Sequence, residues 1–403
     1  MEPLHILIIC ERFAPSIGGL ETHLETLSEF LVERGVSVTV AATKMSPAVS
    51  GPERPYEVSY GPGWGAAWRL LRQASVVHLT YFDYRWLLLA KLAGRRVVLV
   101  YHSHARVCPK GVAWNGKELC SFSTHWRVCP GCLHRDAAWP SVWSKWASLP
   151  IKQWIGDRVD ASVSISRYAE HRFRLARNRT IVNGIDVRRF RPAESPTRDF
   201  ALFIGRLIFE KGAHVLLDAL AQCQVQGRPV RLIIVGDGPQ RGALEEQAHR
   251  LGIAPLVEFR GVVSGAPLTV LLQQAFAVVV PSLGPETCPL TPLEAMACGT
   301  PVIAAASGGL EEIAGAAGLL YPPLDRAALA GRLTRLIEDR ALQRRLAEQG
   351  RRLVEREYDV TRMGSQYLDL YRSVVNGCGT AQPHSADGAV SVSCCNNAQA
   401  GVR

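Results

Sequence analysis

The chain has 403 residues, of which 47% are apolar and 20% charged, and a formal net charge of +10. The length exceeds one typical hydrophobic core, so we expect two domains, and the composition fits a soluble globular protein without a membrane-spanning run of apolar residues. The positive charge favours anionic partners such as nucleotides or anionic lipids, and the absence of any nucleic-acid-binding motif makes nucleic acid the weaker option.

The first half of the sequence predicts alternating strands and helices. An apolar strand at 5–10 begins the chain in place of a signal peptide, so we expect a cytoplasmic protein with mostly reduced cysteines. After a glycine-containing loop, leucines recur at helical spacing until Gly35; they are Leu20, Leu24, Leu27 and Leu31. Further strands are predicted at 36–42, 76–79, 97–100, 161–165 and 180–183.

The second half repeats this pattern after a segment, 187–199, that is typical of an interdomain linker. Strands are predicted at 200–204, 230–235, 256–259 and 277–280, and helices at 244–250, 325–339, 341–356 and 361–375. Strands that alternate with helices favour parallel, doubly wound sheets. The sequence therefore predicts an α/β protein with two such domains facing a central cleft.

Two carboxylates, Glu286 and Glu294, lie in one loop-to-helix segment between apolar runs at 278–280 and 301–306. A strand delivers the loop and another strand returns, which places both acids near the carboxyl ends of parallel strands, where open α/β sheets bind ligands. Glu286 follows Gly284-Pro285, before any helix. Glu294 has a competing interpretation, since Thr291-Pro292-Leu293-Glu294 fits a capping box with Thr291 as the N-cap residue.

The segment Glu286-x7-Glu294 resembles the donor site of the family 4 retaining glycosyltransferases, which have the two-domain GT-B fold. Four further motifs occur in the family's order and extend the likeness over about residues 4–375: Pro15-Ser16-Ile17-Gly18-Gly19-Leu20-Glu21, Asn183-Gly184-Ile185-Asp186, Gly205-Arg206-Leu207 with Lys211-Gly212, and Gly236-Asp237-Gly238-Pro239. The resemblance implies an acceptor-side domain at 1–192 with an insertion at 105–155, a donor domain at 193–360 and a helix at 361–375 that crosses back. The tail at 376–403 is rich in small and polar residues without an apolar period, which predicts disorder.

The resemblance also implies roles for individual residues. Arg206 and Lys211 follow a strand and would stabilise the departing diphosphate. Glu286 and His102 would hold the transferred sugar, with His104 as a competing candidate, and Glu294 would bind the ribose. The rest of the donor site would comprise Gly18, Gly19, Thr287, Cys288, Pro289 and Leu290. No Asp-x-Asp motif is positioned for the diphosphate, so we expect no cofactor to be required for catalysis.

An insertion rich in cysteine and tryptophan interrupts the first half. Its cysteines have the spacing C-x11-C-x8-C-x2-C, and four thiolates suit a structural zinc ion or an iron–sulfur cluster, with four unlinked thiols as the alternative; they are Cys108, Cys120, Cys129 and Cys132. Tryptophans and lysines follow at 139–154. They predict either a helix packed on the sheet or a surface for membrane headgroups.

These observations predict a retaining glycosyltransferase that moves a sugar from a nucleoside diphosphate donor to a carbohydrate or lipid-linked acceptor, in cell-surface polysaccharide or glycolipid synthesis. Peripheral attachment to the inner face of the cell membrane is part of this hypothesis. A non-catalytic nucleotide-sugar-binding protein, a sugar-nucleotide epimerase and an inverting transferase of the same fold are the alternatives. A glycosidase is disfavoured because the capping geometry would tie Glu294 to its helix.

Overall fold

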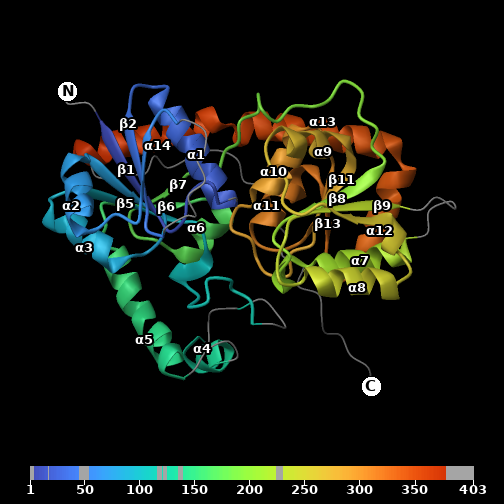
Figure 1. Ribbon diagram of the computed structural model, residues 1–403, viewed down its shortest axis with the longest axis horizontal. Helices are drawn as coiled ribbons and strands as arrows, with labels where there is room; N and C mark the ends of the chain where they lie inside the picture. The colour runs from blue at the N-terminus through green and yellow to red at the C-terminus, as the bar shows by residue number, and fades with distance from the viewer. Residues whose placement is uncertain are drawn as a thin grey trace, which may run out of the picture.

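The computed structural model describes residues 4–16, 18–44, 54–115, 120, 125–134, 139–223 and 230–377. Within these ranges the chain forms two wholly parallel sheets, each covered by helices (Figure 1). We call them, with their helices, the first lobe and the second lobe. The predicted fold class, two doubly wound α/β domains, is confirmed.

The first lobe contains a seven-stranded sheet with the order β3-β2-β1-β4-β5-β6-β7. Its strands are β1 (His5–Cys10), β2 (Ser37–Ala42), β3 (Glu57–Tyr60), β4 (Val76–Leu79), β5 (Arg96–Tyr101), β6 (Ala161–Ser164) and β7 (Asn178–Thr180). The helices are α1 (Gly19–Val32), α2 (Trp64–Gln73), α3 (Tyr84–Leu92), α4 (His125–His134), α5 (Trp139–Gly156) and α6 (Arg167–Phe173), with a short 3-10 turn η1 (His104–Arg106).

The second lobe contains a six-stranded sheet with the order β10-β9-β8-β11-β12-β13. Its strands are β8 (Phe200–Ile204), β9 (Arg231–Val235), β10 (Val257–Phe259), β11 (Ala275–Val280), β12 (Val302–Ala305) and β13 (Leu319–Tyr321). The helical elements are η2 (Phe209–Lys211), α7 (Ala213–Gln222), α8 (Arg241–Arg250), η3 (Ala254–Leu256), α9 (Ala266–Gln274), α10 (Leu290–Ala297), α11 (Gly309–Ala317), α12 (Arg326–Glu338) and α13 (Arg340–Glu357).

The last helix, α14 (Val360–Val375), leaves the second lobe and packs against α1 and β4 of the first (Figure 1). Tyr371 of α14 forms a 2.6 Å hydrogen bond with Nδ1 of His78 in β4. A single apolar cluster runs from Val98 of β5 through this helix to Val278 of β11, so the two lobes share one continuous core. Among the helices that the structure describes, none combines the length and apolar character needed to cross a bilayer.

Several predicted elements differ in extent from the observed ones. The strand predicted at 180–183 is observed as β7, which ends at Thr180. The edge strand β3 was not predicted, since its half-exposed side chains leave no apolar run in the sequence. The helices predicted at 325–339 and 341–356 are observed as α12 and α13. The domain boundaries stay a prediction, and the tail from 378 to 403 lies outside the described residues.

Candidate active site

The candidate site lies where the strand order of the second sheet reverses, between the neighbouring strands β8 and β11. Crevices at the carboxyl ends of such strands are the usual ligand sites of open α/β sheets. Arg206 and Lys211 follow β8, and Glu286 follows β11. Gly212 has a φ of +70°, and a Cβ there would lie 1.9 Å from the Pro281 carbonyl oxygen. Only glycine therefore allows the turn that carries Lys211 to pack directly against the end of β11.

Lys211 and Glu286 form an ion pair beyond the carboxyl ends of β8 and β11. The Lys211 Nζ lies 2.5 Å from Glu286 Oε1, and the Ser282 hydroxyl donates to the same oxygen over 2.7 Å. Burial alone would raise the pKa of Glu286, but the Lys211 ammonium and these hydrogen bonds outweigh it and hold that pKa below its ordinary value. The structure thus brings the predicted phosphate cation and the predicted sugar-binding acid together, both partly open to solvent. Ser282 was not predicted.

Two glycines fix the loop that carries Glu286. Gly308 has a φ of +62°, and the Gly309 amide donates to the Glu286 carbonyl over 2.7 Å. A Cβ on Gly309 would lie 2.2 Å from the Thr287 carbonyl oxygen. The loop therefore rests directly on backbone, which limits its movement and holds the Glu286 carboxylate in place.

The glycine loop of the first lobe lies near α10 of the second. Gly19 lies opposite Leu290 of α10, at 4.0 Å from a Cβ built on the glycine to the leucine Cγ. The Glu21 carboxylate folds back over the start of α1. Burial raises the pKa of that carboxyl, and the Arg12 and Arg206 guanidinium groups oppose the shift, so Arg206 lies within electrostatic reach of Glu21. The donor-binding roles of Gly18 and Gly19 stay a prediction.

Further contacts between the lobes involve the loop after Glu286. The Thr287 hydroxyl donates to the His102 carbonyl over 2.8 Å, and the Asn183 amide donates to the Cys288 carbonyl over 3.2 Å. Glu312 of α11 accepts from the backbone amide of Tyr168 at the start of α6 over 3.0 Å. The residues predicted to flank the donor therefore also join the lobes. The contact of Glu312 was not predicted, since no local pattern marks a partner 144 residues away.

His102 and His104 have different surroundings. The His102 ring packs edge-on against His23, with ring centres 5.0 Å apart, and burial holds its pKa well below the ordinary value. His104 is the imidazole within electrostatic reach of Glu286: burial lowers its pKa to about 4, which the Glu286 carboxylate opposes. His104 Nε2 lies 3.1 Å from the Tyr168 hydroxyl, so this ring is held by α6. A sugar contact of either histidine stays a prediction.

Glu294 lies inside α10 and not at its capping position. The helix begins at Leu290 with Pro289 as the N-cap residue and has no side-chain cap, so the capping-box interpretation, with Thr291 as the cap, is wrong. Glu294 is 8% exposed, and burial raises its pKa to about 7, with Arg189 opposing the shift. The Glu294 carboxyl therefore does not cap the helix, and its contact with the ribose stays a prediction.

The other three insertion cysteines lie within electrostatic reach of Cys129. Burial, together with the thiols of Cys108, Cys120 and Cys132, raises the pKa of Cys129 to about 11. Within the described residues, no three histidine, cysteine or acidic side chains stand close enough to hold an ion. Metal binding there stays a prediction.

Comparisons with known proteins identify the family of the chain. A model described as glycosyltransferase family 4 matches residues 17–189, and one described as glycosyl transferases group 1 matches residues 185–353. A glycogen synthase of Mycobacterium tuberculosis is 27% identical over 94% of this chain and 97% of its own. A phosphatidyl-myo-inositol mannosyltransferase of Mycobacterium leprae is 29% identical over 94% of this chain and 99% of its own.

Solved structures show the same fold. A sucrose-phosphate synthase of Thermosynechococcus elongatus has a TM-score of 0.71 at 24% identity and covers 93% of this chain and 100% of its own. The Anabaena protein HepE, solved with UDP-glucose, has a TM-score of 0.70 at 21% identity and covers 92% of this chain and 100% of its own. With its two GT-B lobes and two matching family models, the chain belongs to the family 4, or group 1, glycosyltransferases.

Proposed function

We propose that this glycosyltransferase moves a sugar from a nucleoside diphosphate donor to a carbohydrate or lipid-linked acceptor with retention of the anomeric configuration. The observation that carries the proposal is the Lys211–Glu286 ion pair at the strand-order reversal, with Arg206 and the Gly18–Gly19 loop beside it. The cations match a diphosphate, and the carboxylate is an acceptor for sugar hydroxyls.

In the proposed reaction, the acceptor hydroxyl oxygen bonds to the anomeric carbon on the face from which the diphosphate departs. The carbon–oxygen bond to the diphosphate breaks, and the hydroxyl proton passes to the departing phosphate oxygen. Arg206 and Lys211 stabilise the negative charge that grows on the phosphate. Glu286 orients the sugar. Because the pKa of Glu286 is low, it remains an anion at neutral pH and acts as a hydrogen-bond acceptor.

The comparisons supply support for the substrates. HepE was solved with UDP and with UDP-glucose, which favours a nucleoside diphosphate sugar as the donor. The two full-length relatives are named for glycogen and for a phosphatidylinositol, which favours an acceptor that is either a glycan or a lipid-linked headgroup. Neither finding selects one sugar.

A membrane-facing surface favours the lipid-linked acceptor. Helices α2, α3 and α5, on the first lobe (Figure 1), carry nine of the sixteen exposed large apolar side chains in the described part of the chain. The same helices contain six lysines and arginines and no aspartate or glutamate. On α5, Trp139, Trp143 and Trp154 are each about half exposed. Exposed aromatic side chains beside basic ones suit an anionic lipid headgroup region.

Turnover of isotope-labelled UDP-glucose and GDP-mannose with an acceptor panel tests the proposal. We expect one donor to give product with retained configuration at the anomeric carbon, as seen by proton NMR. Arg206→Ala should lower kcat by about two orders of magnitude or more, because it removes a positive charge that would stabilise the departing diphosphate. The variant should still fold, since Arg206 is exposed and does not belong to the core. Arg345→Ala, an exposed arginine on α13, is the control and should keep the rate of the unmodified enzyme.

Other outcomes identify the alternatives. Donor binding without turnover would indicate a sugar-nucleotide-binding protein. An altered sugar that remains attached to its nucleotide would indicate an epimerase, and an inverted product would overturn the retaining mechanism.

The membrane surface is tested separately by sedimentation with vesicles of phosphatidylcholine alone or with added phosphatidylglycerol. We expect binding only to the anionic vesicles, and the double variant Trp143→Ala/Trp154→Ala should weaken it. Equal binding to both vesicle types, or binding indifferent to the tryptophans, would end the assignment of this surface.

A further inference from the structure

A cavity of about 170 Å³ lies beneath α5, at the carboxyl ends of β4 and β5. We call it the lysine cavity. Its walls include Tyr81, Phe82 and Tyr101 from the sheet side and Lys145, Leu149 and Lys152 from α5. The three α5 residues are spaced by four and three positions and so share one helix face. The exposed tryptophans of α5 occupy a different face, so one helix presents lysines to the cavity and indoles to solvent.

The lysine cavity has an excess of positive charge. Arg106 also lines it, but its guanidinium is paired with Asp157, 2.7 Å away. Within the described residues, neither Lys145 nor Lys152 has a carboxylate within ion-pairing distance, and α5 itself contains no acid. Two adjacent unpaired ammonium groups at the mouth of a cavity suit a phosphate, which accepts charge-assisted hydrogen bonds from both.

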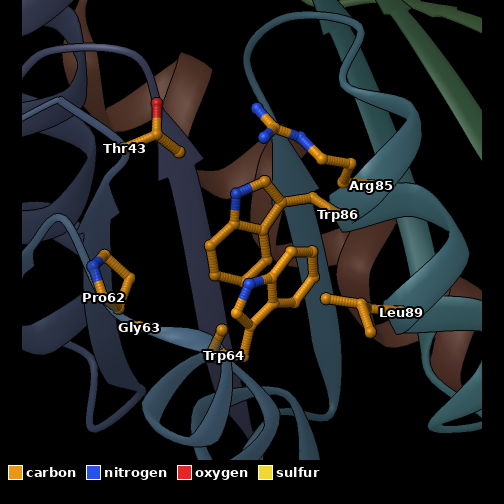
Figure 2. A pocket seen from close by; sticks show the side chains of 8 residues that line it. Thr43, Pro62, Gly63, Trp64, Arg85, Trp86 and Leu89 are labelled. Atoms are coloured by element: carbon orange, nitrogen blue, oxygen red, sulfur yellow. The ribbon is translucent and has the colours of Figure 1, made fainter.

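A second cavity of about 200 Å³ lies between α2 and α3. We call it the tryptophan cavity. Figure 2 shows the indole rings of Trp64 and Trp86 together at its centre, with Leu89 beside them. Trp86 is buried, whereas Trp64 is 69% exposed. An exposed indole over a buried one, next to a leucine, offers an apolar wall to a hydrocarbon chain.

The two cavities are neighbours. Thr43 lines the tryptophan cavity and Tyr81 lines the lysine cavity, and their hydroxyls lie 2.9 Å apart. The lysine cavity is also bordered by His102, whose carbonyl accepts from Thr287 beside Glu286. The lysine cavity thus has contacts with the Glu286 loop through His102 and with the apolar tryptophan cavity through Tyr81.

We infer that these two neighbouring cavities together bind a lipid phosphate: the hydrocarbon lies against Trp64 and Trp86, the phosphate lies between Lys145 and Lys152, and the headgroup sugar reaches towards Glu286. The inference rests on the proposed transferase function and names the chemical class of its acceptor. The order of the two cavities places the phosphate between the hydrocarbon and the reacting sugar. A neutral glycolipid lacks the group that the two lysines would bind.

Decyl phosphate below its micellar concentration is the probe. Decyl glucoside, which has the alkyl chain but no phosphate, and inorganic phosphate, which has no alkyl chain, are the comparison ligands. Binding is measured by isothermal titration and tryptophan fluorescence. We expect decyl phosphate to bind at least about tenfold more tightly than either half. The double variant Lys145→Gln/Lys152→Gln should reduce its affinity to that of decyl glucoside, and Trp64→Ala should weaken decyl phosphate but leave inorganic phosphate unchanged. The control, Arg344→Gln/Arg345→Gln on α13, loses the same charge and should bind normally.

Equal affinity for decyl phosphate and decyl glucoside would overturn the inference, as would lysine variants that bind like the unmodified protein. Inorganic phosphate that binds as tightly as decyl phosphate would indicate a free-phosphate site and overturn it too. A second measurement separates a failure of this inference from a failure of the proposed function: the slow hydrolysis of the sugar donor in the absence of an acceptor. This hydrolysis should persist in the lysine variants. If the unmodified protein does not hydrolyse any donor, that result would count against the transferase proposal itself.

Discussion

Glu294 gives the sharpest test of the site's electrostatics. Burial raises its pKa from 4.5 to about 7, so below about pH 7 the folded protein holds a proton that the unfolded chain releases above about pH 4.5. The stability that this proton contributes is fully present below pH 4.5 and is lost as the pH rises to about 7. At about 1.4 kcal/mol for each pKa unit, the whole loss is about 3 kcal/mol.

Glu294→Gln keeps the shape and removes the titration. We therefore expect the variant and the unmodified protein to have similar free energies of unfolding near pH 4.5, and the variant to be more stable by about 2–3 kcal/mol at pH 8. Urea unfolding followed by tryptophan fluorescence between pH 4.5 and pH 8.5 measures the difference. Because all other groups are unchanged, their titrations cancel in the comparison.

Glu348→Gln is the matched control, since the Glu348 side chain on α13 is 67% exposed. Its difference from the unmodified protein should not vary with pH over this range. If the Glu294→Gln difference is equally flat, burial does not hold the Glu294 carboxyl in its neutral form and the reasoning is refuted.

Three further changes test other parts of the structure. Gly309→Ala places a Cβ 2.2 Å from the Thr287 carbonyl oxygen, so it should displace the Glu286 loop and lower kcat by at least about tenfold in the donor turnover assay. Gly364→Ala places a Cβ 2.2 Å from the Phe30 ring and should destabilise the contact of α14 with α1 by about 1–3 kcal/mol in urea unfolding. Protein expressed with zinc should contain about one zinc ion per chain by mass spectrometry, and Cys129→Ser should lose it.

Each of these changes has a contradicting result. Unaltered kcat in Gly309→Ala would show that the loop does not position Glu286. Gly331→Ala is the control for Gly364→Ala, because this exposed glycine of α12 has no atoms within 4 Å of a built Cβ and the alanine should stabilise the helix by about 0.5–1 kcal/mol. Similar effects at both positions would exclude the steric explanation. Metal-free protein of normal stability would remove the zinc prediction.

The neighbouring positions of Arg206, Lys211 and Glu286 were predictable from the sequence because these residues follow strand ends. Apolar runs before Arg206 and Glu286 mark β8 and β11, and parallel strands bring their carboxyl ends to one edge of the sheet. The pairing of Lys211 with Glu286 needed the strand order as well, since β8 and β11 are neighbours although two strands separate them in the chain.

Other features depended on information that local pattern does not contain. The start of α10 at Leu290 separates Glu294 from the cap, because backbone geometry and not residue preference set the helix start. His102 lies between β5 and η1 with its ring against His23 of α1, whereas His104, the first residue of η1, has its ring against Tyr168 of α6. Such side-chain directions are decided by tertiary packing.

The bond between His78 and Tyr371 joins residues 293 positions apart. During synthesis, β4 emerges from the ribosome 293 residues before the tyrosine that completes its surroundings. The first lobe can collapse while the rest is being translated, but His78 and its apolar neighbours wait for α14 before they are covered. A nascent chain stalled before Tyr371 would therefore present an unfinished surface to chaperones and proteases, even though most of its sheet is already made.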